Sequence, residues 1–340
     1  MTAGVLEETQ SKSIAYCEHC RKERQVHLVE ETETLEIDGI SYSYTIHTGY
    51  CSLCGEKATP QVILEANQRS FSDAVRRHHG IVSQETVEGL PVRYNIRPRP
   101  LSALLGWGEH TYSRFVEGDI PSKVFADRIQ DLYDSPLSFY LLLLNSRDNL
   151  TGVALRKAVK ATKNALASVS PKVERVCAYL IGKTESNSSL ALQKELYYAQ
   201  GMMLAFFGRT LFDAKCEAWQ MGPVFPEVWR RIHPRDVSEE SLQGTDLADC
   251  VRGTFTDDEL TVLDAVVARV GCYSPFALRD ITHSETPWKD ARGDTPADEA
   301  SNNPIDVSDI GAFFMQLKQD YGMKRPSDIG KYLIDMVEKV

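Results

Sequence analysis

Four cysteines near the start of the chain stand in two Cys-x-x-Cys pairs, Cys17 with Cys20 and Cys51 with Cys54. A Cys-x-x-Cys turn presents two sulfurs to one ion, and two such turns complete the tetrahedral shell that Zn2+ prefers. A shell of four thiolates leaves no open position for a substrate. The spacing therefore predicts one structural zinc ion per chain rather than a catalytic metal.

Two alternatives for this cluster stay open at the level of the sequence. The four thiols could be buried or redox-active residues that hold no metal. His19 or His47 could replace one of the sulfurs, although we expect His19, inside the first pair, to lie on the surface.

The stretch between the two cysteine pairs has the pattern of a β-hairpin. Residues 25–36 and 40–48 are rich in Val, Ile, Thr and Tyr, and Asp38-Gly39 between them is a strong turn signal. A pair, a hairpin and a second pair together predict a zinc ribbon.

The charge of the chain is uneven. The formal net charge of −10 over 340 residues argues against a protein that coats nucleic acid along its whole length. Residues 67–116, however, contain seven arginines and only four acidic residues, a local net charge of +3. A chain of this length is expected to form two or three domains, and one of them could therefore be a basic nucleic-acid module.

The basic stretch contains a run of short helical segments. A helix over 62–79 is expected first, ended by Gly80. Short helices over 101–105 and 109–117 are separated by a turn with Trp107 and Gly108, which predicts a helix-turn-helix. Supporting helices are expected over 122–133 and 136–144.

In a helix-turn-helix, the first turns of the second helix contact base edges in the major groove of DNA. Arg114 suits a bidentate contact to guanine, and Arg97 and Arg99, ahead of the first helix, suit phosphates. The other candidate DNA contacts are the polar residues Glu109, His110, Thr111 and Ser113.

The rest of the chain is predicted to be mainly helical. Residues 151–167 form a basic, alanine-rich helix with little apolar face, which we interpret as a connecting rod before a separate domain over 173–322. Four further cysteines are widely scattered, which indicates reduced thiols. With no leader and no apolar run near the ~20 residues of a membrane span, we expect a cytoplasmic protein.

Two family resemblances add to these expectations. The segment 104–118, with Leu104-Leu105-Gly106-Trp107-Gly108-Glu109-His110-Thr111-Tyr112-Ser113-Arg114-Phe115, resembles the Cro/repressor (XRE) family, and its combination with a zinc ribbon resembles MqsA-type antitoxins. The resemblance implies that His110 and Arg114 contact bases. Where that family has Gln and Glu at the start of the first helix, this chain has Pro98 and Pro100, which we expect to shorten the helix. A fold retained only as a dimer scaffold is the alternative to DNA binding.

The segments Leu190-Ala191-Leu192-Gln193-Lys194-Glu195-Leu196-Tyr197-Tyr198-Ala199-Gln200-Gly201 and Glu217-Ala218-Trp219-Gln220-Met221-Gly222-Pro223-Val224-Phe225-Pro226, with Leu278–Ser284 and Pro287-Trp288, closely resemble the Panacea (SocA-like, GepA-like) antitoxin domain. The resemblance implies a compact helical domain that neutralises a toxin by direct binding. Partners in this family include alarmone-synthetase-like toxins, and in one branch the domain delivers the toxin to a protease.

Large amphipathic side chains in this domain are candidates for toxin contacts, although most residues of this kind are expected in the core. His283 beside Ser284 invites a catalytic interpretation, but no nucleophile elbow or triad context accompanies it. We therefore expect no enzyme. The candidate toxin contacts are Lys194, Tyr197, Tyr198, Trp219, Phe225, Trp229, His283 and Trp288.

Together these observations predict a multidomain, mainly α protein with a small β zinc ribbon. The predicted function is a type II antitoxin that binds a toxin through its C-terminal domain and, as a homodimer, represses its own operon. A transcriptional regulator without a toxin partner and a proteolytic adaptor are the alternatives. The expected parts are a flexible tail (1–13), the zinc ribbon (14–60), a connecting helix (61–80), the helix-turn-helix domain (81–147), a linker helix (148–170), the Panacea domain (171–325) and a C-terminal helix (326–340).

Overall fold

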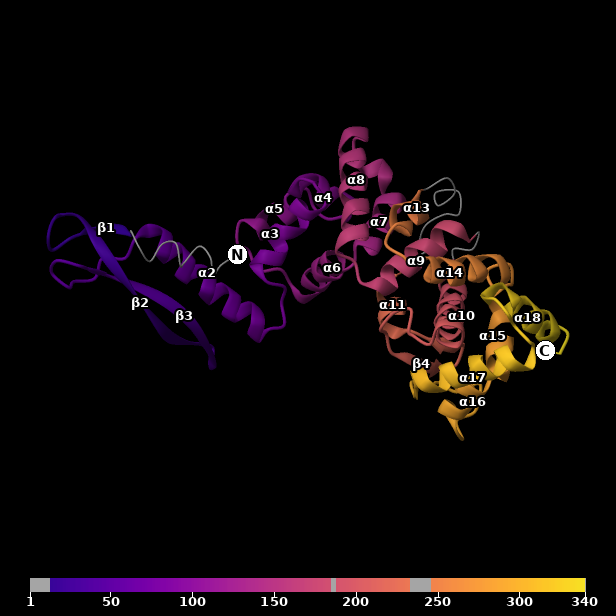
Figure 1. Ribbon diagram of the computed structural model, residues 1–340. Coiled ribbons are helices and arrows are strands. Elements are labelled where there is room, and N and C mark those ends of the chain that lie inside the picture. Colours follow the sequence, from indigo (N-terminus) through magenta and orange to yellow (C-terminus); the bar gives the residue numbers. More distant parts are fainter. Residues whose placement is uncertain (1–12, 185–187, 233–245, 340) are drawn as a thin grey trace. The chain divides into compact units, whose positions relative to one another are not determined.

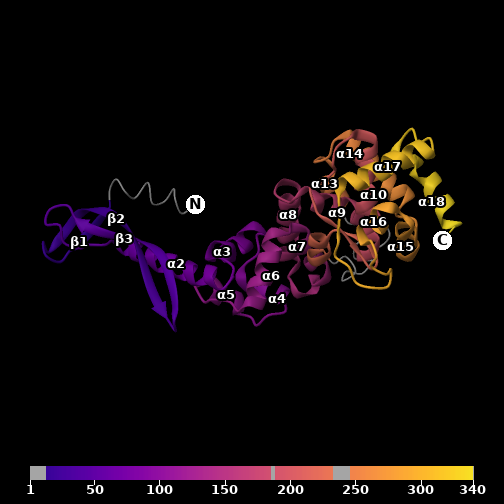
Figure 2. The same cartoon turned by 90° about the horizontal axis from the view of Figure 1, so that it is seen from below.

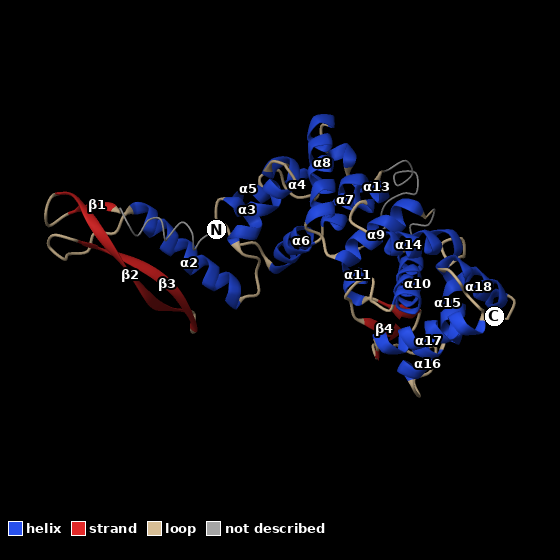
Figure 3. Cartoon of the chain, in the orientation of Figure 1, coloured by secondary structure: helices blue, strands red, loops and turns tan. Residues whose placement is uncertain are grey.

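The computed structural model describes residues 13–184, 188–232 and 246–339 (Figure 1). Apart from Ser13, the predicted flexible tail lies outside these residues. Helices make up most of the chain, as the colouring of Figure 3 shows and as Figure 2 shows from below. The chain forms two compact units, Met1–Gly89 with Arg114–Gln130, and Leu90–Ser113 with Asp131–Val340. Residues 81–147, predicted as one domain, are divided between these units.

The first unit begins with the predicted hairpin. Strands β1 (Ile14–Cys17), β2 (Lys22–Ile37) and β3 (Ile40–Cys51) form an antiparallel sheet in the order β1-β2-β3. Ile37 pairs with Ile40 across the turn, where Asp38 and Gly39 have φ angles of 51° and 78°. Left-handed backbone at both central residues matches the twist of a tight hairpin, which explains the Asp-Gly pair.

Helix α2 (Gln61–His78) supports this hairpin, because two strands alone are marginally stable in water. The Asn67 side chain binds both backbone groups of His47, accepting from its N–H at 2.8 Å and donating to its carbonyl at 2.9 Å. One helical turn further on, Phe71 packs edge-on against Tyr42 and Tyr44 of β3. Helix α2 is therefore bound to the sheet along its length. The unit also contains most of α3 (Gln84–Arg93), the end of α5 (Thr111–Val116) and most of α6 (Lys123–Asp134).

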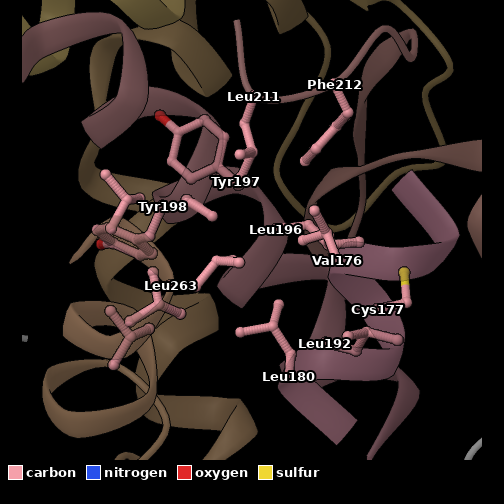
Figure 4. Close-up of a cluster of buried hydrophobic side chains, with 14 of the residues drawn as sticks. Val176, Cys177, Leu180, Leu192, Leu196, Tyr197, Tyr198, Leu211, Phe212 and Leu263 are labelled. Atoms are coloured by element: carbon pink, nitrogen blue, oxygen red, sulfur yellow. The ribbon is translucent and has the colours of Figure 1, made fainter. Parts of the chain in front are cut away.

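The second unit is built around helix α10 (Ser189–Phe207), which is buried along nearly its whole length (Figure 4). A Cβ at Gly201 would lie 2.2 Å from the Phe314 ring, so glycine is required for the packing of α10 against α17. A small sheet of order β5-β4-β6 lies in the same unit. The other elements are α4 (Pro98–Leu104), α7 (Pro136–Asn145), η1 (Arg147–Asn149), α8 (Gly152–Ser168), α9 (Lys172–Lys183), β4 (Cys216–Trp219), β5 (Gly222–Val224), α11 (Pro226–Arg231), α13 (Leu247–Arg252), α14 (Asp257–Arg269), α15 (Pro275–Ser284), α16 (Thr286–Arg292), β6 (Pro304–Ile305), α17 (Val307–Asp320), η3 (Pro326–Asp328) and α18 (Ile329–Val337).

Two segments that we predicted as separate are part of this packing. The predicted connecting rod, α8, packs against α7, α9 and α13 and buries Ala158, Ala165 and Leu166. Its small alanines allow the neighbouring helices to approach closely. The helix is therefore partly buried although its apolar face is weak. The C-terminal helix α18 likewise places Tyr332 and Leu333 in the core that contains α10.

Candidate functional site

The four cysteines of the two pairs converge at one point. The Sγ atoms of Cys17 and Cys54 are 3.5 Å apart, those of Cys20 and Cys51 are 4.0 Å apart, and all four lie within 4.8 Å of one another. A tetrahedron with metal–sulfur bonds of about 2.3 Å has sulfur–sulfur edges of about 3.8 Å, so the four thiols lie close to the spacing that a tetrahedral metal ion requires. The sheet brings them together because β2 pairs with both cysteine turns: Lys22 lies opposite Cys17, and Val26 lies opposite Cys51.

The four thiols differ in acidity: the backbone favours the thiolate of Cys51, whereas burial and the neighbouring thiols hold the pKa of Cys20 and of Cys54 above the ordinary value. The backbone N–H groups of Cys54 and Leu53 lower the pKa of Cys51 to about 6. His19 is exposed, and His47 pairs with Glu30 at 3.4 Å instead of facing the sulfurs. Among the described residues, the converging group consists of the four cysteines and contains no histidine.

The segment that we predict to be a helix-turn-helix differs in detail from that prediction. Helix α4 begins at Pro98, and its prolines fall in the first turn, where the N–H groups have no partner within the helix. The helix therefore begins three residues earlier than the predicted start at Leu101, and both prolines are part of it. The second helix, α5, is shorter than expected, and Glu109 and His110 precede it.

The start of α5 is fixed to α4 by a buried contact. The backbone N–H of Tyr112 donates to Ser102 Oγ at 3.0 Å, and the Tyr112 ring stacks on Trp107. Tyr112 and Ser102 are both fully buried. The candidate DNA contacts of this segment reach the solvent. Arg97, Arg99, Glu109, His110 and Arg114 are exposed, and Thr111 and Ser113 are half-buried.

Two of the exposed arginines face carboxylates. Arg99 forms an ion pair with Glu109, and Arg114 Nε lies 3.9 Å from the Asp119 carboxylate. All four side chains are at least half exposed, so these pairs are weak and open to competition from a phosphate or a base.

Two residues that the sequence analysis did not single out hold the other end of α5. Gln84 Nε2 donates to the carbonyls of Phe115 and Val116 at 3.2 and 3.0 Å. Arg76 is buried and donates to Gln84 Oε1 at 2.8 Å and to the Asp119 carbonyl at 3.2 Å. Arg76 appeared in the sequence as one of seven arginines in a basic stretch, and only its burial sets it apart.

Most of the candidate toxin contacts are buried. Trp219, Trp229 and His283 are half-buried and reach the surface, and Trp219 and Trp229 meet edge to face at 6.0 Å. The remaining five are buried in the interior, where α10 is packed between several helices and the small sheet. These five are Lys194, Tyr197, Tyr198, Phe225 and Trp288.

Two buried ionisable groups make hydrogen bonds within the fold. Lys194 Nζ donates to the Pro223 carbonyl at 2.9 Å, and burial lowers the pKa of Lys194 to about 7. Glu285 accepts from Tyr198 at 2.6 Å and from Tyr332 at 2.9 Å, and burial raises its pKa to about 7. Each group is held by atoms of the fold itself, which gives Lys194 a role in packing.

His283 lies flat against Trp288, with ring centroids 4.0 Å apart. Burial, Lys194 and Arg279 lower the pKa of His283 to about 4, so its ring is neutral at pH 7. The neighbouring Ser284 hydroxyl donates to the Ile281 carbonyl at 2.6 Å, within its own helix. Both side chains therefore make contacts inside the fold, a ring stack for His283 and a hydrogen bond within the helix for Ser284.

No helix in the described part of the chain has the length and apolar character needed to cross a membrane.

Comparison with known proteins identifies part of the second unit. Residues 192–289 match the model of the family described as "Antitoxin SocA-like, Panacea domain". A relative named "Antitoxin SocA", from Caulobacter vibrioides (strain NA1000 / CB15N), is 54% identical over 110 residues. The aligned region covers 30% of this chain and 57% of that relative, a little over half its length. No solved structure matches the chain. The C-terminal part of this protein therefore contains a SocA-like Panacea domain.

Proposed function

We propose that the protein is the antitoxin of a type II toxin-antitoxin pair. In this proposal the Panacea domain neutralises a cognate protein toxin by direct binding. The observation that carries it is the match of residues 192–289 to the SocA-like domain, together with the 54% identity to a protein named an antitoxin. A fragment this similar over 110 residues keeps the same fold and supports a related activity.

The toxin surface is proposed to include Trp219, Trp229 and His283. Large aromatic residues that are half-exposed anchor protein interfaces more often than other residue types do. Trp219 and Trp229 contact each other at the end of β4 and in α11, both inside the region that matches the family. Trp288 supports this surface from below, because its indole N–H donates to the Trp219 carbonyl at 2.8 Å.

The N-terminal half is proposed to repress the protein's own operon. The four-cysteine cluster would hold zinc as a structural ion, and the exposed Arg97, Arg99 and Arg114 supply the positive charge that DNA binding requires. Two recognition helices are needed to read two half-sites about one helical turn apart, so a homodimer is part of the proposal.

Co-expression with the neighbouring open reading frame tests the toxin part. We expect that the neighbour arrests growth when expressed alone and that this protein restores growth. Trp229→Ala should abolish the rescue, whereas Phe276→Ala, which removes an exposed aromatic ring elsewhere in the same unit, should retain it. A neighbour that is harmless alone, or that stays lethal beside this protein, would overturn the proposal.

The same cells separate two other functions. An adaptor that delivers the toxin to a protease would shorten the half-life of the toxin, and this effect would disappear in protease-deficient cells. A regulator without a toxin partner would bind its promoter but rescue no growth.

A further inference from the structure

The inference concerns Arg76, a buried arginine that joins the helix of the ribbon to the end of the recognition helix. Its side chain is 1% exposed and lies at the end of α2, whose earlier turns are bound to β3. A charged group costs several kcal/mol to bury unless hydrogen bonds satisfy it. Arg76 has such bonds: it donates to the Val82 carbonyl at 3.1 Å, to Gln84 Oε1 at 2.8 Å and to the Asp119 carbonyl at 3.2 Å.

Gln84 transmits this anchoring to helix α5. The last carbonyls of a helix have no partner within the helix, and a side-chain donor that reaches them fixes the position of the helix end. The Gln84 amide reaches two of them, on Phe115 and Val116. Because its oxygen accepts from Arg76 at the same time, the orientation of the amide is determined by Arg76.

Asp119 provides a second connection from Arg76 to Arg114. Its carbonyl accepts from Arg76, and its own N–H donates to the Arg114 carbonyl at 3.0 Å. Its carboxylate lies 3.9 Å from the Arg114 guanidinium. The backbone of Arg114 is therefore set by groups that Arg76 holds, and its exposed side chain lies beside the carboxylate of one of them.

We propose that Arg76 is a positioning residue for DNA recognition. Through Gln84 and Asp119 it places Arg114 for its contact with a base, which makes helix α2, and the ribbon bound to it, part of the DNA-reading module. This inference rests on the proposed DNA binding.

The test is a double-mutant cycle on the full chain, with a duplex from its own promoter as the probe. Arg76→Lys keeps the charge and removes the planar fork that bonds to several acceptors at once. We expect it to lower the discrimination between the promoter duplex and a duplex with one substituted base pair by roughly 5- to 150-fold, the range for losing one bidentate base contact. In an Arg114→Ala background, Arg76→Lys should change discrimination by less than about twofold, because the contact that it positions is already gone.

Arg69→Lys is the matched control, since Arg69 lies on the same helix and is exposed. It should leave discrimination unchanged. Metal content and toxin neutralisation should be the same in Arg76→Lys as in the wild type. If Arg76→Lys fails to fold, Gln84→Leu removes the link to α5 and is expected to give the same pattern.

If Arg76→Lys lowers discrimination equally in the wild-type and the Arg114→Ala background, its role is a general structural one and the inference is overturned. Unchanged discrimination in both Arg76→Lys and Gln84→Leu would do the same. Absence of promoter binding by the wild type is a different result, because it would contradict the proposed DNA binding itself.

Discussion

Arg99 and Glu109 form an ion pair on the surface of the helix-turn-helix segment. Both had been candidates for DNA contacts, yet a carboxylate beside Arg99 neutralises its charge where a phosphate would bind and also repels that phosphate. Glu109→Gln should therefore strengthen promoter binding. An exposed pair contributes about 0.2–1 kcal/mol, so we expect a gain of about 1.5- to 5-fold at low salt.

Binding isotherms at several salt concentrations would check this prediction. Freeing one phosphate contact should also steepen the salt dependence by close to one unit in log–log slope. Glu227→Gln removes an exposed carboxylate from α11 and serves as the control. Weaker binding by Glu109→Gln would mean that Glu109 itself accepts a hydrogen bond from a base.

Arg114 and Arg97 should respond differently to substitution by alanine. Arg114→Ala is expected to cost ~1–3 kcal/mol on the promoter and much less on unrelated DNA, because a base contact specifies sequence. Arg97→Ala should weaken binding to both duplexes equally and reduce the salt slope by about one, as a phosphate contact does. Competition titrations with the two duplexes measure both effects. A uniform loss in Arg114→Ala would place base reading elsewhere.

The cysteine cluster predicts a metal-dependent fold for the ribbon. Replacing Cys51 and Cys54 by Ser removes two of four ligands, and the bound metal should fall from one equivalent per chain to none. Without the metal the small core around Cys17, Val26 and Ala58 cannot hold the sheet, so limited proteolysis should cut this region. Elemental analysis supplies the metal count.

Cys272→Ser, at an exposed cysteine outside the cluster, is the control for this pair of substitutions. Neutralisation of the toxin should survive the loss of the ribbon if the Panacea domain acts alone. Loss of neutralisation would instead show that the N-terminal half contacts the toxin.

The local features of the fold could be predicted from the sequence because each has a short-range cause. The hairpin turn follows from the need for left-handed backbone at Asp38 and Gly39, and the convergence of the cysteines follows from the spacing of two turns around that hairpin. The helices that support it were recognised from their glycine and proline boundaries.

Burial could not be predicted where tertiary packing overrides the local pattern. On helix α10, the charged residues Lys194 and Glu195 are buried as completely as the leucines. Neither the position of the charges nor the spacing of the apolar residues therefore predicts which faces of this helix are buried. The burial of Arg76 on α2 could not be predicted for a similar reason, because one of its acceptors, the Asp119 carbonyl, lies 43 residues further along the chain. The resemblance indicated the domain, but which of its aromatic residues reach the surface depended on the packing of the whole unit.

The buried carboxyl groups predict an unusual dependence of stability on pH. The pKa of Glu285 and that of Glu195 are raised to about 7 by burial, from an ordinary value of 4.5. Between these values the folded chain holds protons that the unfolded chain has released, so the contribution of these two groups to stability is greatest below about pH 4.5 and falls as the pH rises to 7. Lys194 has its pKa lowered from 10.5 to about 7, so its contribution rises with pH from 7 to 10.5. His283, whose pKa is lowered from 6.5 to about 4, opposes part of this decline, because between those values the unfolded chain holds a proton that the folded chain lacks. The two carboxyl groups outweigh this one group, so the four groups together predict a minimum of stability near neutral pH.

Urea unfolding followed by tryptophan fluorescence between pH 5 and 7 would measure this decline, which can reach about 1.4 kcal/mol per pH unit for each group. Glu285→Gln should flatten it, because the amide keeps an oxygen for Tyr198 and Tyr332 but takes up no proton. Glu217→Gln, which changes a half-buried carboxyl of β4 bonded to Trp219, should keep the slope of the wild type. The surface carboxylates with lowered pKa, such as Asp335 beside Lys339, lose their contribution only below pH 4 and do not enter this window. An unchanged slope in Glu285→Gln would show that Glu285 is ionised in the folded protein, held by Lys194 and the tyrosine hydroxyls.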